Sequence, residues 1–172
     1  PVTFASQDIA PPKKLLAGTK IGIAKDAAFS FIYSANTRLL EAMGAELHYF
    51  SPISDAHLPQ VDALWFAGGY PELHAEKRAN NISMLKDVSN FNAANKPILA
   101  ECGGFLYCLE SLTDLDENTH RMCGILSGQG AMRGKRGCQG MQAAMLPEGE
   151  VRAHAHHRSR SQNTPAPIAH GK

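Results

Sequence analysis

Short apolar runs alternate with segments of helical periodicity over residues 20–112, and this alternation limits the fold more than any other feature of the sequence. The apolar runs cover residues 20–24, 46–50, 61–67 and 96–100. Between them, residues 29–43 and 82–94 place apolar side chains three and four positions apart. Strands separated by helices build a parallel sheet. We therefore predict an α/β fold with an open, mostly parallel sheet and helices on both of its faces.

The fourth apolar run leads directly into Ala100-Glu-Cys-Gly-Gly104, which predicts a cysteine at a sharp strand-to-helix turn. Apolar residues recur with helical spacing up to residue 112, so a helix is predicted over residues 102–112. A nucleophile at such an elbow needs small neighbours, because the backbone packs closely there and adopts strained angles. The helix N-terminus favours a thiolate at Cys102, and the Gly103 N–H would face an oxyanion beside it. The alternative is a buried structural cysteine at a tight turn.

A second glycine-containing loop, Ala67-Gly-Gly-Tyr-Pro-Glu72, follows the third apolar run. Ligands approach the backbone at the carboxyl ends of strands in open α/β sheets. If this loop and the Cys102 elbow end neighbouring strands, the Gly69 N–H supplies a second donor to an oxyanion. Taken alone, two adjacent glycines are more often simply a turn.

Candidates for the base that a nucleophilic cysteine needs cluster at Arg152-Ala-His-Ala-His-His-Arg158. Metal binding is the first alternative, but His154 and His156 would share one strand face with no third ligand at a useful spacing, so no metal site is predicted. The second alternative is a solvated basic tail.

A chain of 172 residues is long enough for one hydrophobic core, so we predict one domain, at residues 20–160. Residues 1–19 contain prolines and lysines without periodicity and are interpreted as a linker from an upstream domain. The glycine-rich stretch 121–146 is expected to form shorter mixed or antiparallel strands. Residues 161–172 are expected to be a disordered tail.

Charge and hydropathy exclude several classes of partner. A formal net charge of +1 gives no general attraction to nucleic acids or anionic membranes. No apolar run approaches the ~20 residues of a membrane helix, and the first residues do not resemble a secretory signal. The 4 cysteines include no Cys-x-x-Cys pair. We interpret them as reduced thiols in a cytoplasmic protein that binds neither nucleic acid nor membrane.

Five motifs in this order carry a family resemblance: Ala27-Ala-Phe-Ser-Phe-Ile-Tyr33, Phe50-Ser-Pro52, Gly68-Gly-Tyr-Pro-Glu72, Ala100-Glu-Cys-Gly-Gly104 and Arg152-Ala-His-Ala-His-His157. Together they resemble the glutaminase domain of cobyrinic acid and hydrogenobyrinic acid a,c-diamide synthases, which are class I glutamine amidotransferases. The resemblance covers about residues 20–160.

The resemblance implies a role for each matching residue. Cys102 would attack the side-chain amide of glutamine, form a thioester and release ammonia, and water would then free the cysteine. His157 would raise the nucleophilicity of Cys102. Gly69 and Gly103 would form the oxyanion hole, and Tyr70 would contact the substrate. No third triad member is assigned, because position 159 is a serine.

The resemblance also implies a partner. In the family, ammonia passes to an ATP-dependent synthetase domain that amidates the a and c carboxylates of the corrinoid. The sequence contains no Gly-x-x-x-x-Gly-Lys-Ser/Thr, so this domain is predicted to bind no cofactor, and ATP and Mg²⁺ are expected only in the synthetase domain.

The sequence departs from the family pattern in its last third. The stretch Arg-Gly-His-Glu-Phe-His-Tyr-Ser of the family reads Arg152-Ala-His-Ala-His-His-Arg-Ser159, and Gln139-Gly-Met141 stands in place of Leu-Gly-Tyr. Two alternatives are therefore kept open. One is a catalytically impaired or partner-binding module of the same fold, and the other is a cysteine amidohydrolase of related fold that acts on a different amide.

Overall fold

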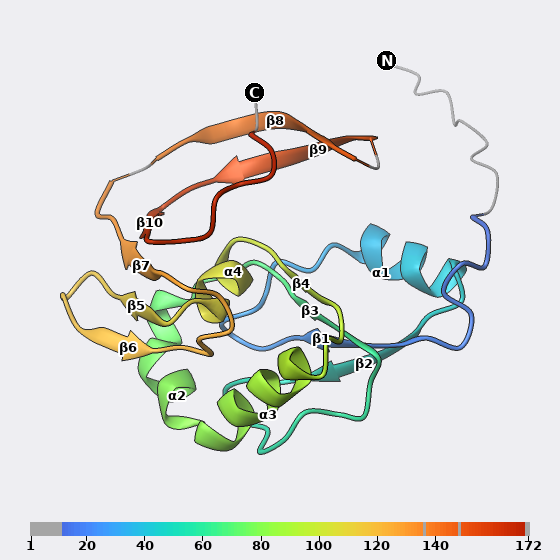
Figure 1. Ribbon diagram of the computed structural model, residues 1–172, viewed down its shortest axis with the longest axis horizontal. Coiled ribbons are helices and arrows are strands. Elements are labelled where there is room, and N and C mark those ends of the chain that lie inside the picture. Colours follow the sequence, from blue (N-terminus) through green and yellow to red (C-terminus); the bar gives the residue numbers. More distant parts are fainter. Residues whose placement is uncertain (1–11, 136, 148, 171–172) are drawn as a thin grey trace, which may run out of the picture.

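The predicted parallel sheet forms the centre of the domain. The computed structural model describes residues 12–135, 137–147 and 149–170 (Figure 1). Four parallel strands pair in the order β2-β1-β3-β4. Their bounds are β1 Lys20–Ala24, β2 Glu46–Phe50, β3 Ala63–Phe66 and β4 Ile98–Ala100. All four runs that the sequence indicated as strands are therefore confirmed, although β3 and β4 begin two residues later than predicted.

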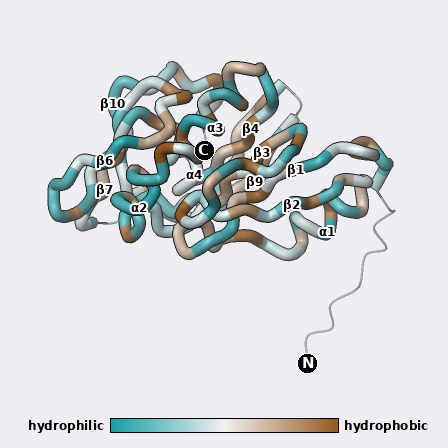
Figure 2. The backbone as a smooth tube through the Cα atoms, turned by 90° about the horizontal axis from the view of Figure 1, so that it is seen from below, coloured by the Kyte–Doolittle hydropathy of each residue, from teal (hydrophilic) through white to brown (hydrophobic). Residues whose placement is uncertain are grey.

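Helices cover both faces of this sheet, as the alternation of apolar segments predicted. Ile21, Ile23 and Trp65 lie on one face, where Leu40 of α1 (Ser34–Ala42) packs against them. The other face belongs to the larger core, to which α3 (Ile82–Ala93) contributes Met84, Leu85, Val88 and Phe91. Figure 2 shows hydrophobic backbone stretches in the centre of the domain, around β3, β4 and α4 (Gly103–Cys108). The site at the sheet's carboxyl edge therefore follows β3, which is buried on both faces, and β4, in which Leu99 is exposed.

Two helices are shorter than predicted. The helix expected over 29–43 begins only at Ser34, because Asp26 Oδ1 accepts hydrogen bonds from the N–H groups of Ala28 (2.8 Å) and Phe29 (3.1 Å) and holds that stretch as a loop. The helix expected over 102–112 ends at Cys108, after which the backbone becomes extended. Leu112 is fully buried but lies in a strand. In both segments, apolar residues keep a helical spacing over a longer stretch of sequence than the helix itself covers.

The chain between β3 and α3 is also helical. A 3₁₀ turn, η1 (Glu72–His74), leads into α2 (Ala75–Asn80). The side chain of Asn81 then accepts a hydrogen bond from Met84 N–H at 3.4 Å and caps α3. These two short elements follow the glycine loop and lead the chain from Pro71 to α3.

The C-terminal part forms mixed and antiparallel strands, as predicted. A second four-stranded sheet has the order β10-β7-β5-β6, with β5 and β7 parallel and the other pairs antiparallel. Its strands are β5 Ser111–Thr113, β6 Thr119–Arg121, β7 Gln129–Met132 and β10 Ser159–Gln162. The separate hairpin of β8 (Gln139–Leu146) and β9 (Gly149–His156) lies above the first sheet in Figure 1.

The described residues refine the expected ends of the domain. Ser161 and Gln162 pair with β7, so the tail expected to be disordered from residue 161 is ordered as far as Gln162. Part of the linker predicted over residues 1–19 lies outside the described residues, as do residues 171–172 of the tail. Leu16, within that linker, packs against the smaller core. No helix in the described ranges combines the length and the apolar character that crossing a membrane requires.

Candidate active site

Cys102 lies at the predicted elbow between β4 and α4. Its backbone angles are φ 49° and ψ −109°, in a region that side chains with a Cβ rarely occupy. Such a conformation stores strain and is typical of functional turns. The cysteine is exposed, whereas Gly103 and Gly104 directly after it are buried. The structure therefore presents the thiol to solvent on a turn whose following residues are packed into the core.

The packing explains why the positions around Cys102 are glycines. A Cβ added to Gly104 would lie 2.1 Å from the carbonyl oxygen of Phe66, at the end of β3. A Cβ added to Gly68 would lie 3.3 Å from Cys102 Cβ. The elbow and the loop after β3 are consequently in direct backbone contact, as expected for loops that end neighbouring strands.

The two predicted oxyanion donors also lie together. A Cβ on Gly103 would be 3.3 Å from the backbone nitrogen of Gly69, and a Cβ on Gly69 would be 2.0 Å from the carbonyl oxygen of Ala28. Within the described ranges, neither the Gly69 nor the Gly103 N–H donates one of the backbone hydrogen bonds that link loops and helix caps. The two backbone groups thus lie next to each other beside Cys102, and whether they bind a ligand oxygen stays a prediction.

Tyr70 and Phe31 form an aromatic pair next to the glycine loop. Their ring centroids are 5.2 Å apart in an edge-to-face arrangement, and both side chains are about two-fifths exposed, at 43% and 41%. The Phe31 N–H donates to the Gly68 carbonyl at 3.0 Å, which ties the two loops together. Phe31 was not selected from the sequence as a site residue. Its place in the site depends on this contact between distant loops.

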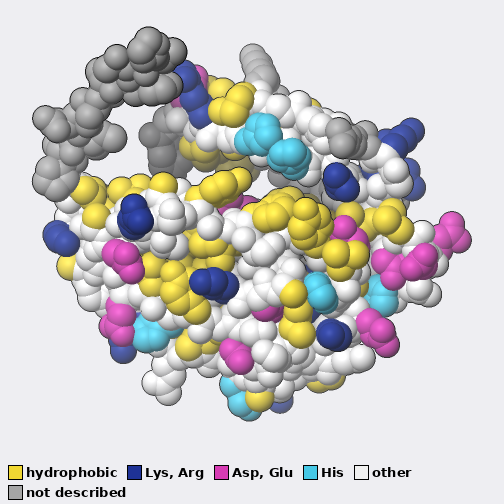
Figure 3. Space-filling model, turned by 180° about the vertical axis from the view of Figure 1, so that it is seen from behind, with side chains coloured by type: hydrophobic (Ala, Val, Ile, Leu, Met, Phe, Trp, Pro, Cys, Tyr) yellow, Lys and Arg dark blue, Asp and Glu magenta, His cyan; other side chains and the backbone are white. Residues whose placement is uncertain are grey.

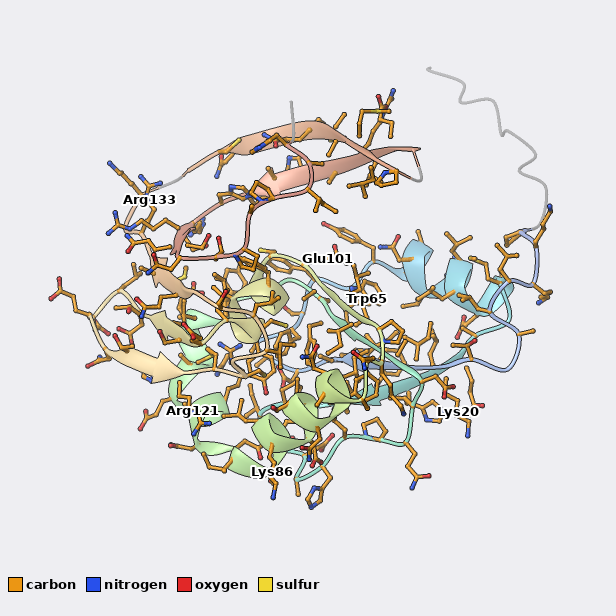
Figure 4. All side chains as sticks on the ribbon, viewed as in Figure 1. Lys20, Trp65, Lys86, Glu101, Arg121 and Arg133 are labelled. Atoms are coloured by element: carbon orange, nitrogen blue, oxygen red, sulfur yellow. The ribbon has the colours of Figure 1, made fainter. Side chains whose placement is uncertain are left out.

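Glu101, immediately before the cysteine, is held by the tryptophan of β3. Trp65 Nε1 donates to Glu101 Oε1 at 2.6 Å, and Figure 4 shows the two residues close together on the side of the core that faces the hairpin. Sequence reasoning missed this pair. The signal available to it was a carboxylate adjacent to the nucleophile together with the single tryptophan of the chain.

His157 lies on a different segment, where the chain passes from β9 to β10. Its side chain is exposed, and its backbone is anchored to the residues before β8: its N–H donates to Cys138 O at 3.0 Å, and its carbonyl accepts from Gly137 N–H at 2.7 Å. The rings of His154 and His156 contact each other, with centroids 4.5 Å apart. Figure 3 shows histidine side chains gathered on the hairpin above hydrophobic side chains of the body of the domain.

The structure thus brings Cys102, Gly69, Gly103 and Tyr70 into one place. No hydrogen bond in the described residues joins Cys102 to His157. In the same residues no three His, Cys, Asp or Glu side chains come together as a set of metal ligands.

The four thiols differ in their exposure, which leads to a labelling prediction. Burial raises the pKa of Cys108 to about 12, and burial followed by the nearby Cys108 raises the pKa of Cys123. Because thiolates react and buried neutral thiols do not, iodoacetamide at neutral pH should label only Cys102 and Cys138 in the folded chain. Intact-mass measurement should show two adducts, and four after unfolding in urea. Labelling of Cys108 in the folded chain would contradict the packing of α4.

An open parallel sheet with a cysteine elbow at its carboxyl edge and backbone donors beside it has the architecture of a class I glutamine amidotransferase-like fold. The chain belongs to the family of CobB/CobQ-like glutamine amidotransferase domains, whose family model matches residues 20–170.

Relatives with curated names agree with this membership. The chain is 45% identical over 171 residues to a hydrogenobyrinate a,c-diamide synthase from Stutzerimonas stutzeri, and 43% identical over 171 residues to one from Pseudomonas aeruginosa. It is 42% identical over 151 residues to a cobyrinate a,c-diamide synthase from Herminiimonas arsenicoxydans. These alignments cover 99%, 99% and 87% of the chain, but only 40%, 39% and 34% of the relatives. The chain therefore spans about two-fifths of the length of these relatives.

A solved structure resembles the fold. A crystal structure of a protein described as peptidase E from Listeria monocytogenes superposes with a TM-score of 0.50 at 13% identity and covers 64% of each chain. At this identity the likeness concerns the fold alone.

Proposed function

We propose that this chain is the glutaminase domain of a corrinoid a,c-diamide synthase. It would hydrolyse glutamine through a thioester on Cys102 and deliver the ammonia for ATP-dependent amidation of cobyrinic or hydrogenobyrinic acid. The observation that carries the proposal is the left-handed elbow at Cys102, packed against Gly68 and Gly69, in a chain that belongs to an amidotransferase family.

The chemistry follows from the arrangement of the donors. The Cys102 thiolate attacks the side-chain amide carbon of glutamine, and the carbonyl oxygen becomes an oxyanion that accepts hydrogen bonds from the N–H groups of Gly69 and Gly103. His157 takes the thiol proton and returns it to the departing nitrogen, so that ammonia leaves and a thioester remains. Water attacks the thioester through a second oxyanion, and glutamate and the free thiol are formed.

Tyr70 and Phe31 give the proposed site an apolar wall beside these donors. Their edge-to-face contact fixes both rings, and the Phe31 N–H bond to Gly68 fixes the wall relative to the glycine loop. Such a wall suits the methylene groups of a glutamine side chain whose amide points toward Cys102. We assign Tyr70 the role of contacting the substrate on this basis.

The proposed acceptor of ammonia is a synthetase portion on the same or another polypeptide. The relatives named as a,c-diamide synthases are more than twice as long as this chain, and the sequence has no P-loop motif for nucleotide phosphates. ATP and Mg²⁺ would thus act in the synthetase portion. Relatives named hydrogenobyrinate synthases and cobyrinate synthases both match the chain, so either corrinoid acid fits the proposal as the acceptor.

The electrophilic glutamine analogue 6-diazo-5-oxo-L-norleucine tests the proposal. It should alkylate Cys102, and glutamine should protect this residue, because only a thiol beside an oxyanion hole recognises the carbonyl of the analogue. Cys138 is an internal control, since it is also exposed. Peptide mapping identifies the modified cysteine.

Two other results would reject the glutaminase. If iodoacetamide labels Cys102 but the analogue does not, the chain is a cysteine amidohydrolase for a different amide or, as the second candidate function, a partner-binding module of the same fold. The exposed His157 on a separate segment is the observation that favours this second candidate. If both reagents modify Cys102 and Cys138 equally, the site does not recognise glutamine.

A further inference from the structure

A buried arginine lies behind the candidate site and has no role in the chemistry described above. Arg78, in α2, is 0% exposed. Among the described residues, no other charged side chain is buried. An arginine side chain remains charged in proteins, and burying a charge is costly unless the surroundings compensate for it. Its contacts therefore need an explanation.

Three contacts hold the guanidinium group. Nη2 donates a hydrogen bond to the carbonyl oxygen of Pro71. The guanidinium carbon lies 5.1 Å from the ring centroid of Tyr107 and 5.5 Å from that of Phe29. Both distances are within the range of cation–π attraction, which is stronger away from water.

These partners belong to the three segments that build the candidate site. Phe29 follows Ala28, whose carbonyl oxygen contacts Gly69. Pro71 ends the loop that contains Gly69, and its Cδ lies 3.0 Å from the position of a Cβ on Gly103. Tyr107 belongs to α4, the helix that begins immediately after Cys102. One guanidinium group thus connects the glycine loop, the loop before α1 and the elbow helix.

Stability alone does not account for a charge at this position. Burial lowers the pKa of Arg78, while Tyr107, Asp26, Cys123 and Glu72 raise it. Nε and Nη1 of Arg78 are buried and have no hydrogen-bond partner among the described residues. Replacing buried charges by apolar groups of similar volume is often neutral or stabilising. A long apolar side chain would fill the same space between the two rings without this cost, but it could not hold the Pro71 carbonyl.

We propose that Arg78 is a positioning residue that fixes the Gly69 N–H relative to the Gly103 N–H through the Pro71 carbonyl. This role rests on the proposed glutaminase function. Pro71 is two residues after Gly69 and touches Gly103, so a shift of the Pro71 carbonyl displaces one donor against the other. Displacement of a catalytic group by about 1 Å can lower a rate by roughly a hundredfold.

Two Arg78 variants and one control test the proposal. Arg78→Met keeps the volume and removes the hydrogen bond, whereas Arg78→Lys keeps the charge but not the planar group that lies between the rings. Lys77→Met removes a neighbouring, exposed charge from the same helix. The measurements are kcat and KM for glutamate release, the midpoint of urea unfolding, and hydrogen exchange at the amides of residues 68–72 and 103, except Pro71, which has no N–H.

We expect both Arg78 variants to lose about tenfold or more in kcat with little change in KM. Amide exchange at residues 68–72 should become faster, and the unfolding midpoint of Arg78→Met should stay near that of the unaltered chain. Lys77→Met should change none of these quantities. If the Arg78 variants fold and keep both kcat and amide protection, the proposal is wrong. It is also wrong if both variants unfold, because Arg78 is then a stability residue.

Hydrogen exchange separates this proposal from the proposed function. If the unaltered chain releases no glutamate but exchange at residues 68–72 is faster in Arg78→Met, the glutaminase assignment fails, and Arg78 orders the glycine loop without a role in catalysis. If the unaltered chain is active and the Arg78 variants match it in every measurement, only the positioning role fails.

Discussion

Replacing Cys102 with alanine is expected to lower glutamate release from glutamine by roughly 10⁴-fold or more, because the covalent step loses its only nucleophile. The measurement is glutamate formed from saturating glutamine, detected with glutamate dehydrogenase. Cys138→Ala is the matched control, since it removes the other exposed thiol and should leave turnover unchanged. Equal turnover in the Cys102→Ala variant would falsify the thioester mechanism.

The same substitution should leave the fold intact, so that a loss of activity can be attributed to chemistry. The Cys102 side chain is exposed, and alanine accepts the same φ of 49° at a similar conformational cost. Surface substitutions of this kind change the free energy of unfolding by about 0.5 kcal/mol or less. The urea midpoint of Cys102→Ala should therefore match that of the unaltered chain. A large fall in that midpoint would show that the Cys102 thiol is packed inside the protein and not exposed to solvent.

The sheet could be predicted from the sequence because its central strands, β1 and β3, are buried on both faces and form continuous apolar runs. The strand ends could not be predicted in this way. Val61 is buried but precedes β3, and its carbonyl accepts a hydrogen bond from Lys96 Nζ at 2.8 Å. The ends of a strand are thus set by backbone hydrogen bonds to its neighbours, which the sequence does not reveal, and not by which side chains are buried.

The end of the elbow helix shows the same limit. Leu109 and Leu112 continue the helical spacing of the residues before them, and both belong to the larger core. Leu109 is extended, with ψ 174°, and the Cys123 N–H donates to the Tyr107 carbonyl. A backbone donor from a distant part of the chain therefore competes successfully with the last helical turn. Periodicity records which side chains are buried, but not which backbone groups are paired.

The candidate site divides in the same way. Cys102, Gly69 and Gly103 could be predicted because each belongs to a short motif whose geometry is local, with small residues around a sharp turn. Phe31 and Arg78 could not, because their place depends on contacts between loops far apart in the sequence. A positively charged residue on a short helix is ordinarily solvated. Nothing in the local sequence indicates that the Arg78 side chain passes behind Pro71.

The family resemblance implies a role for His157, but the local sequence pattern does not indicate where its side chain lies. The stretch that contains it departs from the family pattern, yet its backbone is held on both sides, by Cys138 O and by Gly137 N–H. These two bonds fix the point at which the chain leaves the hairpin for β10. The family resemblance distinguishes His157 from His154 and His156, whose backbone is also held, by pairing with β8.

Replacing His157 with glutamine is expected to lower kcat for glutamate release by roughly 10²- to 10⁴-fold, which is the range for loss of a general acid–base group. KM should change little, because the imidazole acts on the protons of Cys102 and of the departing nitrogen. Glutamine keeps the polarity and most of the volume of histidine, so the two backbone hydrogen bonds should persist. Steady-state kinetics at several glutamine concentrations separates the two constants.

His154→Gln and His156→Gln are the matched controls, because they change the same chemical group within three residues of His157. Their rings contact each other on β9, which pairs with β8 opposite Met141 and Gln139. If only His157 acts as the base, both control variants should keep the kcat of the unaltered chain. If one of them loses activity while His157→Gln keeps it, the base lies on β9, and that residue, not His157, corresponds to the catalytic histidine of the family. If all three variants remain active, the proton is taken by a group outside this cluster.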